Sequence, residues 1–285
     1  MAGPDQHEAN DGADEAPAAD VQTAEVPPVG RHVHPDPAPD AEVSARRRQA
    51  ILAGHGGDAP MARDLLTDPT APVRVAALGA LDRIAQSGGV DGLTTSELAT
   101  SLGDPEPAVR RRALEALAGP DQSGADQADH EAAGTDIADR DQASRLAPAL
   151  VVLLSACLGD ADHSVVEVAC WAAGELPEVA ETTVDALTAV AGPVDGPEPG
   201  GHEDALCREA AVAALGALGH ERGRAAVLGG LRDRPAIRRR AVLALAAFEG
   251  DDVEAALERA LDDRDWQVRQ AAEDMLGPGA TGDRP

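Results

Sequence analysis

One pattern of apolar and polar residues recurs along this chain from residue 73 onward. After an apolar first residue, further apolar residues fall four, seven and eight positions later, often with another at eleven. That spacing puts them on one face of an α-helix and excludes a strand, whose side chains alternate with a period of two. Repeat positions are counted from the first residue of each copy, position 0, which is Val73, Val109, Val165, Cys207, Ile237 or Val268.

A shorter apolar segment precedes each copy, so the repeating unit is a pair of helices. We predict these first helices at 61–66, 96–102, 146–158, 184–191, 224–231 and 253–261. Asp68-Pro69 and Asp104-Pro105 between the two helices are typical of a helix end followed by a new helix start. Without two inserted segments the period is about 30 residues, as in two-helix solenoids.

Composition divides the chain into one repeat domain with extensions. Residues 1–40 are rich in Ala, Asp, Glu and Pro without an apolar period, and we predict a disordered acidic tail there. The solenoid is expected at 41–277, with loop insertions at 119–143 and 192–203 and a disordered tail at 278–285. Residues 41–53, with Val43, Ala50 and Ile51 at positions 0, 7 and 8, are interpreted as a capping helix.

Aromatic residues are nearly absent, because the chain has only Phe248, Trp171 and Trp266. Ala, Leu and Val must therefore form the core, which favours closely packed helices over a β-sandwich.

The formal net charge of −27 argues against nucleic acid and anionic membranes as partners, since both attract basic surfaces. All 24 basic residues are arginine, and acids are spread along the whole length. This composition resembles that of cytosolic proteins from salt-accumulating halophilic archaea. With no apolar run of about 18 residues and no signal pattern at the N-terminus, we expect no membrane association and a cytoplasmic location.

The repeats resemble the HEAT-like repeats named after phycobilin lyases, with the pattern Asp-Pro-x-x-x-Val-Arg-x-x-Ala-Ala-x-Ala-Leu-Gly. Val73–Leu81, Val109–Leu117 and Cys207–Gly216 carry the likeness, which extends over about 41–277. The resemblance implies an all-α fold, a right-handed α-α superhelix (solenoid) of about six two-helix repeats plus an N-terminal capping helix. Its second helices would line the concave side. It implies no single function, because such repeats serve lyases, hydroxylases and scaffolds.

An arginine stands at position 1 in five copies, and in three of these an acid stands six residues earlier. This spacing lets the arginine cap the turn and reach a neighbouring aspartate. We therefore predict a structural Asp/Arg ladder between repeats rather than a ligand site. Its members are Asp68, Arg74, Asp104, Arg110, Asp263 and Arg269.

Four further arginines and both tryptophans are candidates for partner binding. Arg111, Arg112, Arg239 and Arg240 extend two ladder arginines into triplets, and a third triplet lies at 46–48. In so acidic a chain, basic patches suit an acidic protein or a phosphate-bearing ligand, although they could also balance carboxylates on adjacent helices. Trp171 and Trp266 could anchor a partner or pack within the repeats.

No motif in the sequence supports catalysis. Deoxyhypusine hydroxylase, also built of HEAT-like repeats, binds two irons through His-Glu pairs at the start of its second helices. The four pairs of this chain lie elsewhere, at His7-Glu8, His130-Glu131, His202-Glu203 and His220-Glu221. Cys157, Cys170 and Cys207 lie in apolar helical patterns and are interpreted as buried hydrophobic residues. We expect no catalytic residue, no metal ligand and no cofactor.

The sequence thus predicts a non-catalytic protein-protein interaction scaffold or adaptor that binds a partner on its concave face. The alternative is a lyase-like or hydroxylase-like accessory enzyme acting on a cofactor or a protein substrate. Visible absorbance or stoichiometric iron in the purified protein would favour the enzyme.

Overall fold

The computed structural model describes residues 39–88, 91–119, 147–192 and 201–277, and these residues form helices and turns without any strand. All of the described helices belong to the compact unit Ala38–Pro285. Residues 1–38 of the predicted N-terminal tail, the predicted tail at 278–285 and most of both predicted insertions lie outside the described residues. Pro39 and Asp40, the last two residues of the predicted N-terminal tail, begin the first described helix instead.

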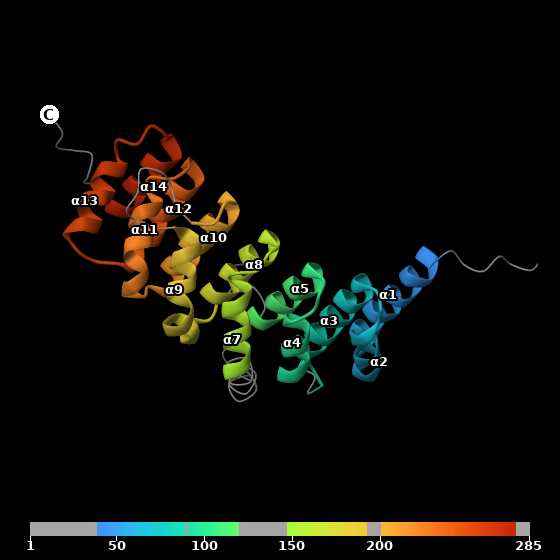
Figure 1. The fold of residues 1–285 in the computed structure, drawn as a ribbon. Coiled ribbons are helices and arrows are strands. Elements are labelled where there is room, and N and C mark those ends of the chain that lie inside the picture. Colours follow the sequence, from blue (N-terminus) through green and yellow to red (C-terminus); the bar gives the residue numbers. More distant parts are fainter. Residues whose placement is uncertain (1–38, 89–90, 120–146, 193–200, 278–285) are drawn as a thin grey trace, which may run out of the picture. The chain divides into compact units, whose positions relative to one another are not determined.

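The described residues form one leading helix and six helix pairs (Figure 1). The leading helix is α1 (Pro39–Gly56). The pairs are α2 (Ala59–Asp64) with α3 (Ala71–Gln86), α4 (Thr95–Leu102) with α5 (Pro107–Ala118), α7 (Pro148–Cys157) with α8 (His163–Gly174), α9 (Ala180–Ala191) with α10 (Ala205–Leu218), α11 (Arg224–Gly230) with α12 (Pro235–Ala244), and α13 (Asp251–Ala260) with α14 (Trp266–Leu276). Short 3-10 turns extend or precede some of them, at Leu65–Thr67, Pro177–Val179, Glu221–Gly223 and Leu245–Ala247.

The pairs stack so that their second helices form one layer. α1 packs on α3, and each second helix packs on the next from α3 through α5, α8, α10 and α12 to α14. Each first helix packs on the second helix of its own pair, which places the first helices in the other layer (Figure 1). This arrangement confirms the prediction of an all-α solenoid with about six repeats and a capping helix.

The core follows the periodicity of the second helices. Positions 0, 4, 5, 7 and 8 are buried, as α3 shows with Val73, Ala77, Leu78, Ala80 and Leu81. Buried residues of successive second helices from α3 to α14 belong to one apolar cluster, and a smaller cluster joins α1, α2 and α3. Burying each leucine fully contributes about 1.5–3 kcal/mol relative to leaving it exposed.

The register predicted for the capping helix is wrong. Arg46 of α1 binds Asp68 in the way that position-1 arginines bind the next repeat, so Ala45 and not Val43 is position 0. Ile51, which was expected on the buried face, is 39% exposed. The physical reason is that no described repeat precedes α1, so α1 is covered where it faces α3 and α2.

Second helices approach one another most closely at position 9. Glycine occupies it in α1, α8 and α10, and each glycine faces an alanine at position 7 of the next second helix. A Cβ atom added at Gly216 would lie 2.5 Å from the Cβ atom of Ala244, which is closer than real side chains approach. Small residues at these two positions therefore set a short distance between α10 and α12.

Within the described residues, no helix is long and apolar enough to cross a membrane.

Candidate partner-binding surface

Arginines at position 1 join each turn to the turn of the next repeat. Arg74 donates from Nε and Nη2 to both carboxylate oxygens of Asp104, at 2.9 and 2.8 Å, and from Nη1 to the backbone carbonyl of Asp68 at 2.9 Å. One guanidinium thus holds its own turn and the following one, in the two-pronged geometry that arginine forms with a carboxylate. The same bonding to a following carboxylate joins Arg110 to Asp160, Arg208 to Asp233, and Arg238 to Asp263.

Each ladder aspartate also closes its own turn. Oδ1 of Asp263 accepts a hydrogen bond from the backbone N–H of Asp265 at 2.8 Å, and Asp68 and Asp104 do the same two residues onward. The hydrogen bond from Arg238 and this backbone bond outweigh burial and lower the pKa of Asp263. The hydrogen bond to Asp263 in turn raises the pKa of Arg238.

The six predicted ladder residues lie in the turns of the first, second and sixth helix pairs, and within each of these turns the arginine binds the backbone carbonyl of the aspartate and not its carboxylate. Asp68 accepts from Arg46, Asp104 from Arg74, and Asp263 from Arg238. Arg269 donates to the carbonyl of Asp263, and no described repeat follows it. The sequence analysis did not identify Asp160 and Asp233 as members of the ladder. Asp160 precedes a copy that lacks the arginine, and Asp233 stands five rather than six residues before its own.

The ladder is interrupted between α8 and α10. Val166 stands at position 1 of α8 and is fully buried, and His202 stands where the other repeats have aspartate. His202 still closes its turn, because its Nδ1 accepts from the backbone N–H of Asp204. Both members of the arginine–aspartate pair expected between α8 and α10 are thus replaced. The ring of His202 contacts the ring of His163 edge to face, with 6.5 Å between the ring centroids.

The arginine triplets divide into three roles. Their first members, Arg46, Arg110 and Arg238, belong to the ladder. The third members of two triplets lie over the preceding second helix. Arg112 lies across Gly79 and donates from Nη2 to Oδ2 of Asp82 at 2.5 Å. Arg240 lines a groove beside Ala213 and Gly216, where its one recorded contact is with Glu209 at 3.7 Å.

Positions 2, 3 and 6 of the second helices from α5 to α12 face outward, and we call them the second-helix surface. None of the twelve side chains at these positions is fully buried. They are Arg111, Arg112 and Glu115 on α5, Glu167, Val168 and Trp171 on α8, Glu209, Ala210 and Ala213 on α10, and Arg239, Arg240 and Leu243 on α12. The structure thus brings five of the six candidate binding residues to one surface.

Three residues of this surface have side-chain donors without partners among the described residues. The buried Nε of Arg111 has no hydrogen-bond partner. Arg239 is exposed and, within the described ranges, forms no recorded hydrogen bond or ion pair. Trp171 packs its ring against the core, and no hydrogen bond of its indole N–H is recorded within the same ranges.

Trp266 is separate from this surface. It is the first residue of α14, directly after the N-cap Asp265, and is 64% exposed at the turn of the last repeat. The structure therefore does not bring the two tryptophans together.

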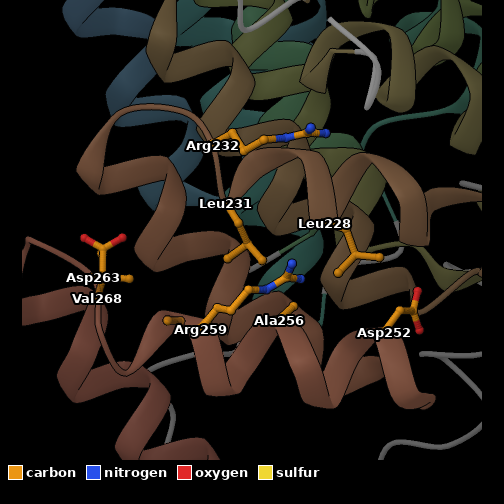
Figure 2. Close-up of a pocket in the computed structure, with 9 residues that line it drawn as sticks. Leu228, Leu231, Arg232, Asp252, Ala256, Arg259, Asp263 and Val268 are labelled. Carbon is orange, nitrogen blue, oxygen red and sulfur yellow. The ribbon is translucent and has the colours of Figure 1, made fainter. Parts of the chain in front are cut away.

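A pocket of about 420 Å³ lies in the other layer, between α11 and α13 (Figure 2). Its lining combines apolar residues such as Leu228, Leu231 and Ala256 with two arginines and two aspartates, and the side chain of Arg259 extends along it in the close-up. The carboxylates at its rim are already bound, Asp252 by Arg224 and Asp263 by Arg238. Its lining contains no histidine, cysteine, serine or threonine.

Residues that commonly hold metals or react are dispersed in the described chain. No group of three or more His, Cys, Asp and Glu residues there is arranged to hold a metal ion. His202 closes a turn, and His220 caps another and contacts Glu181, whereas His7 and His130 lie outside the described residues. Burial raises the pKa of Cys157 and of Cys207 to about 11 and also raises that of Cys170, which disfavours thiolates at neutral pH.

Comparison with known proteins agrees with this architecture. Residues 201–277 match the family model of HEAT repeats. A designed armadillo repeat protein in complex with the peptide (KR)4 is 17% identical, with a TM-score of 0.54 over 76% of this chain and 97% of its own. A second designed armadillo repeat protein is 19% identical, with a TM-score of 0.51 over 76% and 99%. An engineered protein is 19% identical, with a TM-score of 0.54 over 77% and 97%.

No curated protein matches the sequence. At these identities the similar structures show the fold alone. The chain is therefore an α-solenoid whose fold is similar to that of armadillo repeat proteins, and its residues 201–277 match the family model of HEAT repeats.

Proposed function

We propose that this protein is a non-catalytic scaffold that binds a partner protein on the second-helix surface. The observation that carries the proposal is the contrast between two sets of arginines. Each position-1 arginine that precedes another described repeat binds an aspartate of that repeat, and α8 has Val166 in place of the arginine. Arg111 and Arg239 on the second-helix surface form no such bond to a neighbouring repeat.

The residue types on this surface suit protein binding. Arginine and tryptophan are the side chains most often found at the energetic centres of protein interfaces. Trp171 is held by the core on one side and exposes the remainder, so little side-chain entropy would be lost on binding.

Peptide binding by a similar fold supports the proposal. One designed armadillo repeat protein of similar structure holds the peptide (KR)4, which shows that this architecture can present a peptide-binding surface. The alternative of a lyase-like or hydroxylase-like enzyme has less support, because the lining of the pocket between α11 and α13 contains no histidine, cysteine, serine or threonine and its two carboxylates bind arginines. A cytoplasmic location remains a prediction from the sequence.

An affinity capture from extracts of the source cells tests the proposal. The wild type is compared with a surface variant that carries Arg111→Glu, Trp171→Ser and Arg239→Glu. A control variant, Arg259→Glu with Arg264→Glu, changes the charge equally away from this surface. We expect the wild type and the control to capture the same partner and the surface variant to lose it. Equal capture by all three, or capture by none, would contradict the proposal.

A further inference from the structure

Two arginines occupy the same repeat position but have different surroundings. Arg112 and Arg240 both stand at position 3 of a second helix and both reach back over the preceding second helix. Position 9 of that preceding helix is Asp82 for Arg112 and Gly216 for Arg240. Position 9 therefore gives Arg112 a carboxylate and gives Arg240 none, and the carboxylate beside Arg240 is that of Glu209 at 3.7 Å.

The exposure of the two side chains follows from this difference. The side chain of Arg112 is 21% exposed and donates to Asp82 at 2.5 Å. The side chain of Arg240 is 46% exposed, and its contact with Glu209 at 3.7 Å is too long for a hydrogen bond. Arg240 thus lies beside an unfilled groove of about 280 Å³ between α10 and α12.

The groove is shaped for a short side chain. Its walls are chiefly alanines and Gly216, with Leu243 at 40% exposure on the α12 side. The chain cannot supply an acid at position 9 itself, because a Cβ atom on Gly216 would collide with Ala244. Residue 216 therefore cannot supply the carboxylate that Asp82 supplies to Arg112, and the native α10 places no aspartate beside Arg240.

We propose that an aspartate side chain of an acidic partner segment enters the groove between α10 and α12 and binds Arg240, as Asp82 binds Arg112. This inference rests on the proposed scaffold function and names the chemistry that the partner contributes. Arg239, exposed and next to Arg240, attracts the same segment, and Leu243 contacts the apolar atoms beside its carboxylate. The pair between Asp82 and Arg112 is the intramolecular template of the bound state.

Nuclear magnetic resonance of the arginine Nε–Hε groups in the full chain tests this inference without a natural partner. The probe is the peptide Ac-Gly-Ala-Asp-Ala-Gly-NH2, and its matched control has Asn in place of Asp. We expect a saturable shift of the Arg240 signal with the Asp peptide and none with the Asn peptide. The Arg112 signal should stay fixed, since Asp82 already occupies its site. A shift at Arg240 no larger than that at the exposed Arg264 would overturn the inference.

The variant Ala213→Glu supplies a second test, because it puts a carboxylate beside Arg240 within the chain. We expect it to weaken binding of the Asp peptide by about tenfold or more, the effect of losing one charge-assisted hydrogen bond. Unchanged peptide affinity would count against the inference. If partner capture depends on the second-helix surface while the peptide leaves Arg240 unaffected, the inference fails and the proposed function stands. If no partner is captured while the peptide binds, the proposed function fails instead.

Discussion

At the scale of single residues, the arginine at position 1 is the side chain that defines the repeat junctions. In Arg238, Nε and Nη2 donate to the carboxylate of the next repeat, and Nη1 donates to a backbone carbonyl of its own turn. Arg238 is 6% exposed at its side chain, so its loss would leave a largely buried carboxylate without its counter-charge.

Replacing Arg238 by methionine should therefore destabilise the fold. We expect a loss of about 1–3 kcal/mol, because Asp263 would keep its charge without a charged donor. Arg269→Met is the matched control and should cost less, since Arg269 donates only to a backbone carbonyl. Urea unfolding followed by circular dichroism measures both variants, and equal losses would show that the ion pair does not matter.

The ion pair between Arg238 and Asp263 should also make the stability of the fold depend on pH in the acidic range. The bond from Arg238 holds the pKa of Asp263 below that of the unfolded chain, about 3.9. The contribution of Asp263 is therefore complete above about pH 4 and is lost as pH falls through the folded value. Between about pH 4 and pH 2, Asp263→Asn should show a shallower decline of stability with acid than the wild type. Parallel declines would exclude Asp263 as a source of acid sensitivity.

At the scale of helices, small residues at positions 7 and 9 allow second helices to pack closely. Helix propensity alone would favour alanine over glycine by about 1 kcal/mol. Packing opposes that preference at Gly216, where an added methyl group would meet Ala244 at 2.5 Å.

Gly216→Ala should destabilise the protein despite its better helix propensity. We expect a loss of about 1–3 kcal/mol from overpacking between α10 and α12. Gly56→Ala is the control, because a Cβ atom there meets nothing within 4 Å, and it should be neutral or stabilising. The melting temperatures of the two variants test this prediction. A higher melting temperature for Gly216→Ala would show that the helices can move apart at little cost.

At the scale of the whole molecule, periodicity in the sequence predicted the repeat fold well. Apolar spacing identified every second helix, and the predicted first helices coincide with the observed ones to within a few residues. The register of α1 could not be read in this way, because the apolar spacing of 41–53 does not show which side of the helix has a neighbour.

The sequence also did not predict which carboxylates the arginines bind. Arg110 binds Asp160 across fifty positions of chain because an insertion separates the two repeats. Arg112 appeared equivalent to Arg240 in the sequence, yet only Arg112 has an aspartate on the helix before it. Such differences arise from which residues neighbouring repeats place opposite each other, and periodicity alone does not reveal that.

The net charge of the whole chain predicts that stability depends on salt concentration. A net charge of −27 should repel itself at low ionic strength, where the screening length grows to about 30 Å at 0.01 M. We expect the melting temperature and helicity to fall on dialysis from molar into millimolar salt, as the resemblance to halophilic proteins implies. Circular dichroism measures both, and unchanged values would contradict that interpretation.

The most direct test of the account is photo-crosslinking in the source cells from two exposed aliphatic positions. Leu243 lies on the second-helix surface at 40% exposure, and Val152 lies on first helix α7 at 64%. With a benzophenone amino acid at either position, we expect one discrete protein adduct from position 243 and none from position 152. Adducts from position 152 alone, or from neither position, would contradict the claim that the second-helix surface binds a partner.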